Sequence, residues 1–188
     1  MADPWYDAVH GNAGILQGDL ILNCPLMAWK SDFQLEGEGD DEQLASQYEI
    51  VADDVVVMTQ ACDLEQRKVD DVVVCSMHSL EEAKALWLQR QQPGTSENAW
   101  KRYFEKINSG SIWNLAVLNR GQANGLTTAH RIVDFHEIAT VPLTFLEAVA
   151  VKRGPRLRLR PPYREHLSQS FARYFMRVGL PSSVDSPW

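Results

Sequence analysis

The sequence predicts a single domain of the α+β class, in which apolar strands and amphipathic helices share one core. Two runs of three valines, at 55–57 and 72–74, are typical of buried strands because β-branched side chains favour extended backbone. Ser79 and Glu82 have the spacing of a capping box, which begins a helix. With 188 residues, 45% of them hydrophobic, residues 1–188 are long enough and apolar enough for one core.

The first predicted strand is short. Gly18 and Asp19 form a turn signal, the apolar run at 20–22 follows it, and we expect Pro25 to end the strand. Residues 30–47 are polar and acidic, which predicts a surface loop.

The valine runs belong to the next two predicted strands, at 49–58 and 72–77. Neither run alternates with polar residues, which indicates that both faces of each strand are covered. The connection between the two strands is too long for a tight hairpin. We therefore expect two adjacent core strands with this connection at their edge.

Residues 79–110 predict a pair of helices. The first begins at the capping box and stops at Pro93-Gly94. The second has one apolar face because large apolar side chains recur in it at spacings of four and three: Trp100, Phe104 and Ile107.

The rest of the chain predicts two more strands and two more helices. Apolar runs at 112–118 and 130–135 are typical of strands, and a short helix is expected from about Leu143. The final helix is predicted over 163–178, where Gly179 caps it.

The charges are divided unequally along a chain whose net charge is -7. Residues 36–54 hold many acidic side chains and no basic one, whereas residues 152–177 hold seven arginines and a lysine against one acid. Such a division indicates that the basic part meets an anion, or that the two parts meet each other. The negative net charge disfavours RNA as a partner.

Composition and motifs exclude several classes of protein. No apolar run approaches the ~20 residues that span a bilayer, and the N-terminus does not read as a signal peptide. We therefore expect a cytoplasmic protein with no membrane partner. The three cysteines form neither a disulfide framework nor a CxxC zinc pattern. No P-loop or dinucleotide fingerprint is present, so we expect no metal and no cofactor.

Five segments follow one another in a suggestive order: "QGDLILNCP", "DVVVMTQ", "DVVVCSM", "HRIVDFHEIATVPLTFL" and "YREHLSQSFARYFMRVGL". This order resembles that of the MazF/PemK-like toxins. The resemblance implies a small SH3-like β-barrel closed by a C-terminal helix, with residues 79–110 as an inserted helical pair. It also implies a bacterial toxin-antitoxin or phage-defence setting and a chain that could pair as a homodimer.

The chain departs from this family at the catalytic positions. Family ribonucleases carry a basic residue just before the strand that corresponds to 55–58, where this chain has Asp53 and Asp54. A carboxylate pair repels RNA phosphates. The family's hydroxyl residue would fall near Ser76 to His78. We therefore expect an interaction or regulatory module that binds a protein partner.

The connection between the valine strands carries the first candidate site. Gln60, Cys62 and Asp63 form a polar cluster there, and we expect His78 at the edge of the same strand pair. A catalytic thiol needs a base or a positive charge nearby. The alternative function is therefore an endoribonuclease or another hydrolase that acts through these residues. A small buried cysteine, beside an aspartate that caps the turn, explains the same pattern without catalysis.

Three alternating arginines are the second candidate site. Arg156, Arg158 and Arg160 would lie on one face of an extended segment. That face could bind an anion, an acidic partner or the chain's own acidic loop at 36–42. A solvated edge strand that is kept charged against aggregation has the same pattern.

Overall fold

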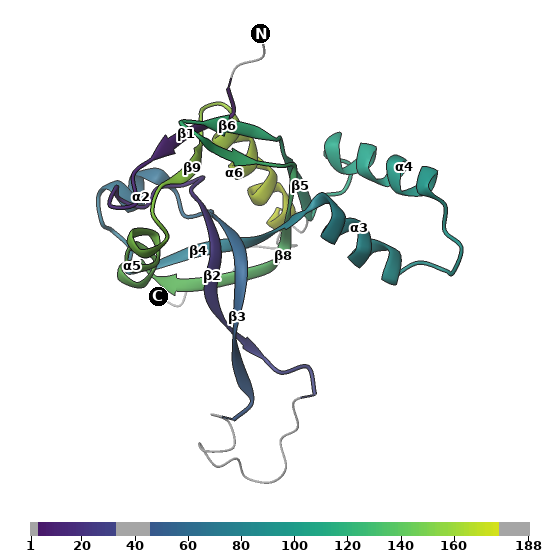
Figure 1. The fold of residues 1–188 in the computed structure, drawn as a ribbon, viewed down its shortest axis with the longest axis horizontal. Helices are drawn as coiled ribbons and strands as arrows, with labels where there is room; N and C mark the ends of the chain where they lie inside the picture. Colours follow the sequence, from purple (N-terminus) through teal and green to yellow (C-terminus); the bar gives the residue numbers. More distant parts are fainter. Residues whose placement is uncertain (1–3, 33–45, 177–188) are drawn as a thin grey trace, which may run out of the picture.

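The computed structural model describes residues 4–32 and 46–176 (Figure 1). In chain order its strands and helices are β1 (Tyr6–Val9), β2 (Leu20–Trp29), β3 (Tyr48–Val57), α2 (Ala61–Glu65), β4 (Asp71–Ser79), α3 (Leu80–Gln89), α4 (Glu97–Asn108), β5 (Leu115–Leu118), β6 (Gly121–Ala123), β7 (Leu126–Thr128), β8 (Arg131–Pro142), α5 (Leu143–Arg153), β9 (Arg156–Leu159) and α6 (Tyr163–Phe175).

The fold is mixed α+β, as predicted. The main sheet has five strands in the order β2-β3-β4-β8-β5, and two further two-stranded pairs, β1-β9 and β6-β7, lie beside it. These sheets are not closed in the part of the chain that the structure describes. No helix there is both long and apolar enough to cross a bilayer.

The valine runs are adjacent, which confirms the prediction made from them. β3 and β4 pair antiparallel, with Val56 opposite Cys75 and Val57 opposite Val74. Val55 and Val57 pack into one hydrophobic cluster, while Val56 packs into a second. The two faces of the sheet are therefore both covered, and each fully buried valine contributes about 1.5–3 kcal/mol.

The first strand that the sequence predicted corresponds to β2, and it is longer than predicted. β2 continues through Pro25, which pairs with Ala52, and ends at Trp29. Proline is tolerated here because β2 is an edge strand of the main sheet. A register shift between Ile21 and Cys24 interrupts the pairing, and Asn23 within it has a φ of 50°.

Several short elements were not predicted. The long connection between the valine strands contains α2, the chain begins its fold with β1, and the turn at Asn124-Gly125 joins β6 to β7. β8 runs through Pro142, well beyond the predicted end at residue 135. The acidic loop at 36–42 lies outside the described residues.

The predicted helical pair is present as α3 and α4, which project from the body beside β5 (Figure 1). Trp100 and Ile107 of α4 are buried against Ile132 of β8. Ser79 caps α3 through the predicted capping box with Glu82. The insertion is therefore anchored to the end of β4 by its cap and to the sheet by one aromatic face.

Candidate functional site

Strand β8 contains a long bulge where it passes β4. The pairing on β8 jumps from Ile138 to Val133 while β4 advances by two residues, so Ser76 alone lies opposite residues 134–137. Bulges occur often beside active sites because they redirect side chains that a regular strand would alternate between faces. The bulge therefore marks the place on the sheet where function is most expected.

Hydrogen bonds fix the shape of this bulge. The Oδ1 atom of Asp134 accepts a bond of 2.9 Å from the backbone N–H of His136, and the Nδ2 atom of Asn114 lies 3.4 Å from the same oxygen. Phe135 is fully buried and packs edge-on against Phe171 of α6, with ring centroids 5.4 Å apart. Residues 134 and 136 thus bond to one another while residue 135 anchors the bulge in the core.

His78 and Glu137 form an ion pair beside the bulge. The Nε2 atom of His78 lies 2.7 Å from Oε2 of Glu137. This hydrogen bond is the main reason that the pKa of His78 is raised, with burial acting against it and the charges of Glu137, Asp53 and Asp134 adding to it. The same bond lowers the pKa of Glu137. The imidazole is therefore held as a cation over a wider pH range than in water.

A cavity of about 220 Å³ lies between this part of the sheet and the two inserted helices. The rings of Trp87 and Tyr103 are stacked on its helix side, with centroids 5.2 Å apart, and Trp100 packs against both. The sheet side supplies three ionisable side chains: His78, Asp134 and Glu137. The cavity thus combines an aromatic wall with a charged one.

Arg90, Gln91 and Tyr103 add further polar side chains to the lining of the cavity. Burial raises the pKa of Tyr103, and the charge of Asp134 raises it further while that of Arg90 opposes the change. Arg90 also helps to lower the pKa of Glu137. These groups are therefore close enough to influence one another, which is typical of a binding or catalytic site. Sequence reasoning missed Asp134 and Glu137, and the polar residues on either side of Phe135 in an otherwise apolar strand are the signal that could have pointed to them.

Asp53 and Asp54 of β3 lie next to this site. The hydroxyl of Ser76 donates a short hydrogen bond to Oδ2 of Asp53. Asp54 accepts from Nη1 of Arg131 at 2.8 Å and from the backbone N–H of Asn23 at 2.8 Å. The positions at which the family resemblance implies a cation and a hydroxyl are therefore adjacent in space, and a carboxylate occupies the first of them.

The structure does not bring Cys62 and His78 together. Cys62 is exposed in α2, with its Sγ atom 3.7 Å from Oε1 of Gln60 and 3.7 Å from Oδ1 of Asp63. α2 adjoins the beginning of β4, whereas His78 lies near the end of that strand, which leads into α3 on the other side of the body (Figure 1). At about 3.3 Å per residue the strand separates them by far more than a hydrogen bond.

The expected proximity of thiol and imidazole is therefore wrong, while Gln60, Cys62 and Asp63 do cluster as predicted. The explanation of Cys62 as a buried hydrophobe is wrong too, because the side chain is exposed. Arg67, a basic residue that follows α2, pairs with Glu147 at 2.9 Å.

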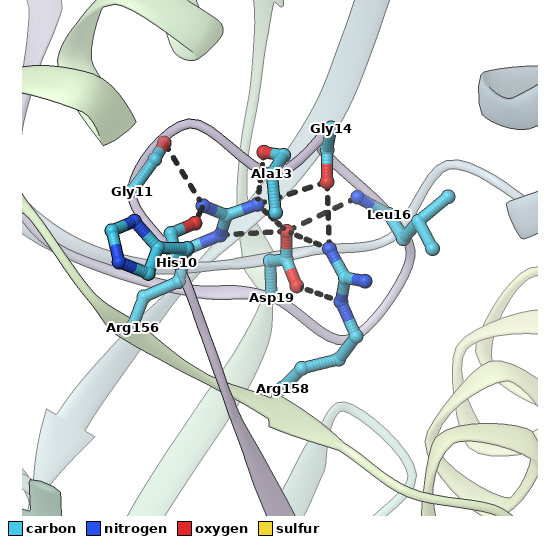
Figure 2. A network of polar contacts seen from close by, with 8 residues as sticks. All are labelled: His10, Gly11, Ala13, Gly14, Leu16, Asp19, Arg156 and Arg158. Atoms are coloured by element: carbon cyan, nitrogen blue, oxygen red, sulfur yellow. Dashed lines mark hydrogen bonds and ion pairs between the residues drawn. The ribbon is translucent and has the colours of Figure 1, made fainter.

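The arginine strand is directed inwards. Asp19, which is completely buried, accepts hydrogen bonds from both Arg156 and Arg158 (Figure 2). Arg156 also donates to backbone carbonyls of the loop before β2, namely those of His10, Gly11, Ala13 and Gly14. This network fastens the loop to β9.

The predicted binding role of these arginines has little support from their positions. Arg156 is only 6% exposed, and its guanidinium is surrounded by protein oxygens. Arg158 donates to Gly14 as well as to Asp19. Arg160 is the most accessible of the three, and its Nε atom lies 3.6 Å from Asp7. A solvated, charged edge strand has little support either, because the side chains of Arg156 and Arg158 are only 5% and 16% exposed.

Across residues 4–32 and 46–176, no group of three or more His, Cys, Asp or Glu side chains is arranged to hold a metal ion. No protein-family model matches the chain, and no curated protein is significantly similar to it.

Proposed function

We propose that this chain is an interaction or regulatory module, built on a MazF/PemK-like, SH3-like barrel, that binds a protein partner in the cavity beside the β8 bulge. The observation that carries the proposal is the convergence of His78, Asp134 and Glu137 on a cavity whose other wall is aromatic. A few polar groups gathered in a recess with apolar walls are typical of recognition sites. The insertion of α3 and α4 creates this recess.

The chemistry of the cavity favours a basic side chain on the partner. The carboxylates of Asp134 and Glu137 attract a guanidinium or an ammonium group, and aromatic rings attract the same groups. Arg90 adds a positive charge to the lining. A partner segment with a carboxylate next to its basic side chain would therefore meet complementary charges at both positions.

The bacterial toxin-antitoxin or phage-defence setting rests on the resemblance alone. The hydrogen bond between Ser76 and Asp53 supports an interaction role over RNA cleavage, because a carboxylate at that position disfavours a phosphate. The hydrolase alternative through Cys62 and His78 lacks this kind of support, since the two residues are far apart.

The proteins encoded next to this chain are the first partners to test. Each is co-expressed with it, and any complex is measured by isothermal titration calorimetry. We expect Glu137→Gln to weaken binding about tenfold or more, because it removes a charge-assisted hydrogen bond. Tyr103→Phe tests the helix side of the cavity. Glu105→Gln, an exposed change on α4, is the matched control and should leave the affinity unchanged.

Two outcomes would contradict the proposal. If Glu137→Gln and Tyr103→Phe bind the partner as tightly as the wild-type chain, the partner binds elsewhere. If the purified chain cleaves single-stranded RNA at a rate that Asp53→Ala together with Asp54→Ala does not change, the chain is a ribonuclease.

A further inference from the structure

A second cavity, of about 270 Å³, lies between β2, β7 and the turn from α5 to β9. Its walls are mainly apolar, with Leu22, Leu126, Ala150 and Leu157 among them. None of these residues lines the cavity beside the β8 bulge. The two sites are therefore separate, and an inference about this one does not depend on the proposed function.

Arg153 places a positive charge at this cavity. Its Nη2 atom donates a hydrogen bond of 2.7 Å to the backbone carbonyl of Asn23, which holds the guanidinium in place. Among the described residues, no carboxylate lies within 4.0 Å of it. A guanidinium has five N–H donors, so most of those of Arg153 remain for a ligand.

A second basic residue, Arg156, contributes to the lining of this cavity. It shares the carboxylate of Asp19 with Arg158. Two guanidinium groups against one carboxylate leave one formal positive charge on this network (Figure 2). Both charged residues in the lining are therefore basic, although the chain as a whole carries a net charge of -7.

We propose that this cavity binds a small monocarboxylate with an apolar body. The carboxylate pairs with the planar fork of Arg153, and the apolar body lies against the leucine side chains. A single accessible guanidinium matches one carboxylate, and the apolar walls strengthen the ion pair by excluding water. The same chemistry is offered by a short fatty acid and by the C-terminus of an apolar peptide.

The test compares three probes that share one tail: octanoate, octan-1-ol and octylammonium. Binding to the full chain is measured by isothermal titration calorimetry. We expect octanoate to bind tightest, and Arg153→Gln to weaken it about tenfold or more while changing octan-1-ol less than about twofold. Lys152→Gln, the exposed neighbour on α5, is the matched control and should leave all three affinities unchanged.

Two further measurements complete the test. Thr127→Trp, an exposed change in the lining, should fill the cavity and abolish octanoate binding while the circular dichroism melting curve stays cooperative. N-acetyl-leucyl-leucine, compared with its C-terminal amide, shows whether a peptide terminus is preferred over a fatty acid. Equal affinity for the three tail probes, no effect of Arg153→Gln, or no binding of either carboxylate would overturn the proposal.

Discussion

Asp19 and Arg156, which are 137 positions apart in the sequence, are joined by a buried hydrogen bond of 2.8 Å from Nε to Oδ2. Both side chains are almost inaccessible, at 0% and 5% exposure. Because Arg156 also donates to carbonyls at 10–14, the network holds the whole loop before β2 against β9.

Replacement of Asp19 by asparagine should destabilise the fold strongly. It leaves two guanidinium groups without their carboxylate in a buried site, which costs about 3–5 kcal/mol. The measurement is urea denaturation followed by circular dichroism. Asp7→Asn is the control, because the exposed pair with Arg160 is worth less than about 1 kcal/mol. Equal losses in the two variants would show that Asp19 is not the centre of the network.

The His78–Glu137 pair should make stability depend on pH. The pKa of His78 is raised above 6.5, so its contribution is complete below pH 6.5 and is lost as pH rises through the raised value. The pKa of Glu137 is lowered below 4.5, so its contribution is complete above pH 4.5 and is lost as pH falls through the lowered value. The pair therefore stabilises the fold most between these two limits.

Two measurements check this dependence. The loss of unfolding free energy in His78→Gln should be larger at about pH 5.5 than at about pH 9. Nuclear magnetic resonance titration should show a lower pKa for His78 in Glu137→Gln than in the wild-type chain. A pKa of His78 that stays the same in this variant would assign the shift to other charges.

The capping box of α3 should be worth about 1 kcal/mol. The Oγ atom of Ser79 accepts a hydrogen bond of 3.2 Å from the backbone N–H of Glu82. The Oε2 atom of Glu82 accepts one of 2.7 Å from the backbone N–H of Ser79. Ser79→Ala should therefore speed amide hydrogen exchange along α3. Ser96→Ala provides the control at the start of α4, since the Ser96 side chain makes no capping bond. Similar effects of the two changes would mean that the box adds nothing.

Cys62 should be the cysteine that reacts with a thiol probe in the folded chain. It is exposed, whereas Cys24 and Cys75 are buried, with pKa values that burial raises to about 11 and about 12. Ellman's reagent at neutral pH should label one thiol per chain, and Cys62→Ala should remove that signal. Labelling of more than one thiol before unfolding would contradict the buried positions.

Local patterns predicted the central strands and the longer helices well, but not the short helix α2. A run of valines or a capping box carries its information within a few residues, so the strands β3 and β4 and the start of α3 follow from sequence alone. The strands β1, β6 and β7 were missed because each has only three or four residues and no period to detect.

The site could not be predicted because it depends on long-range pairing. Glu137 meets His78 across 59 positions, beside a bulge on β8 that no local pattern predicts. The same limit explains why the role of the arginines was not predicted. Their alternation predicted a shared face, but it could not predict that the buried carboxylate of Asp19 lies against that face. The polar cluster at Cys62 was recognised correctly. Its distance from His78 could not be predicted without knowing in which direction β4 runs from α2.

The first residues of the fold, β1 and Asp19, both depend on β9 near the end of the chain, and this has a consequence for synthesis on the ribosome. Asp19 emerges 137 residues before Arg156, which at ordinary translation rates is a delay on the order of ten seconds. During that interval the nascent chain holds an unneutralised carboxylate and an uncovered first strand. A chaperone that binds nascent chains, or slow codons placed after residue 159, would therefore affect the yield of this protein more than its final stability.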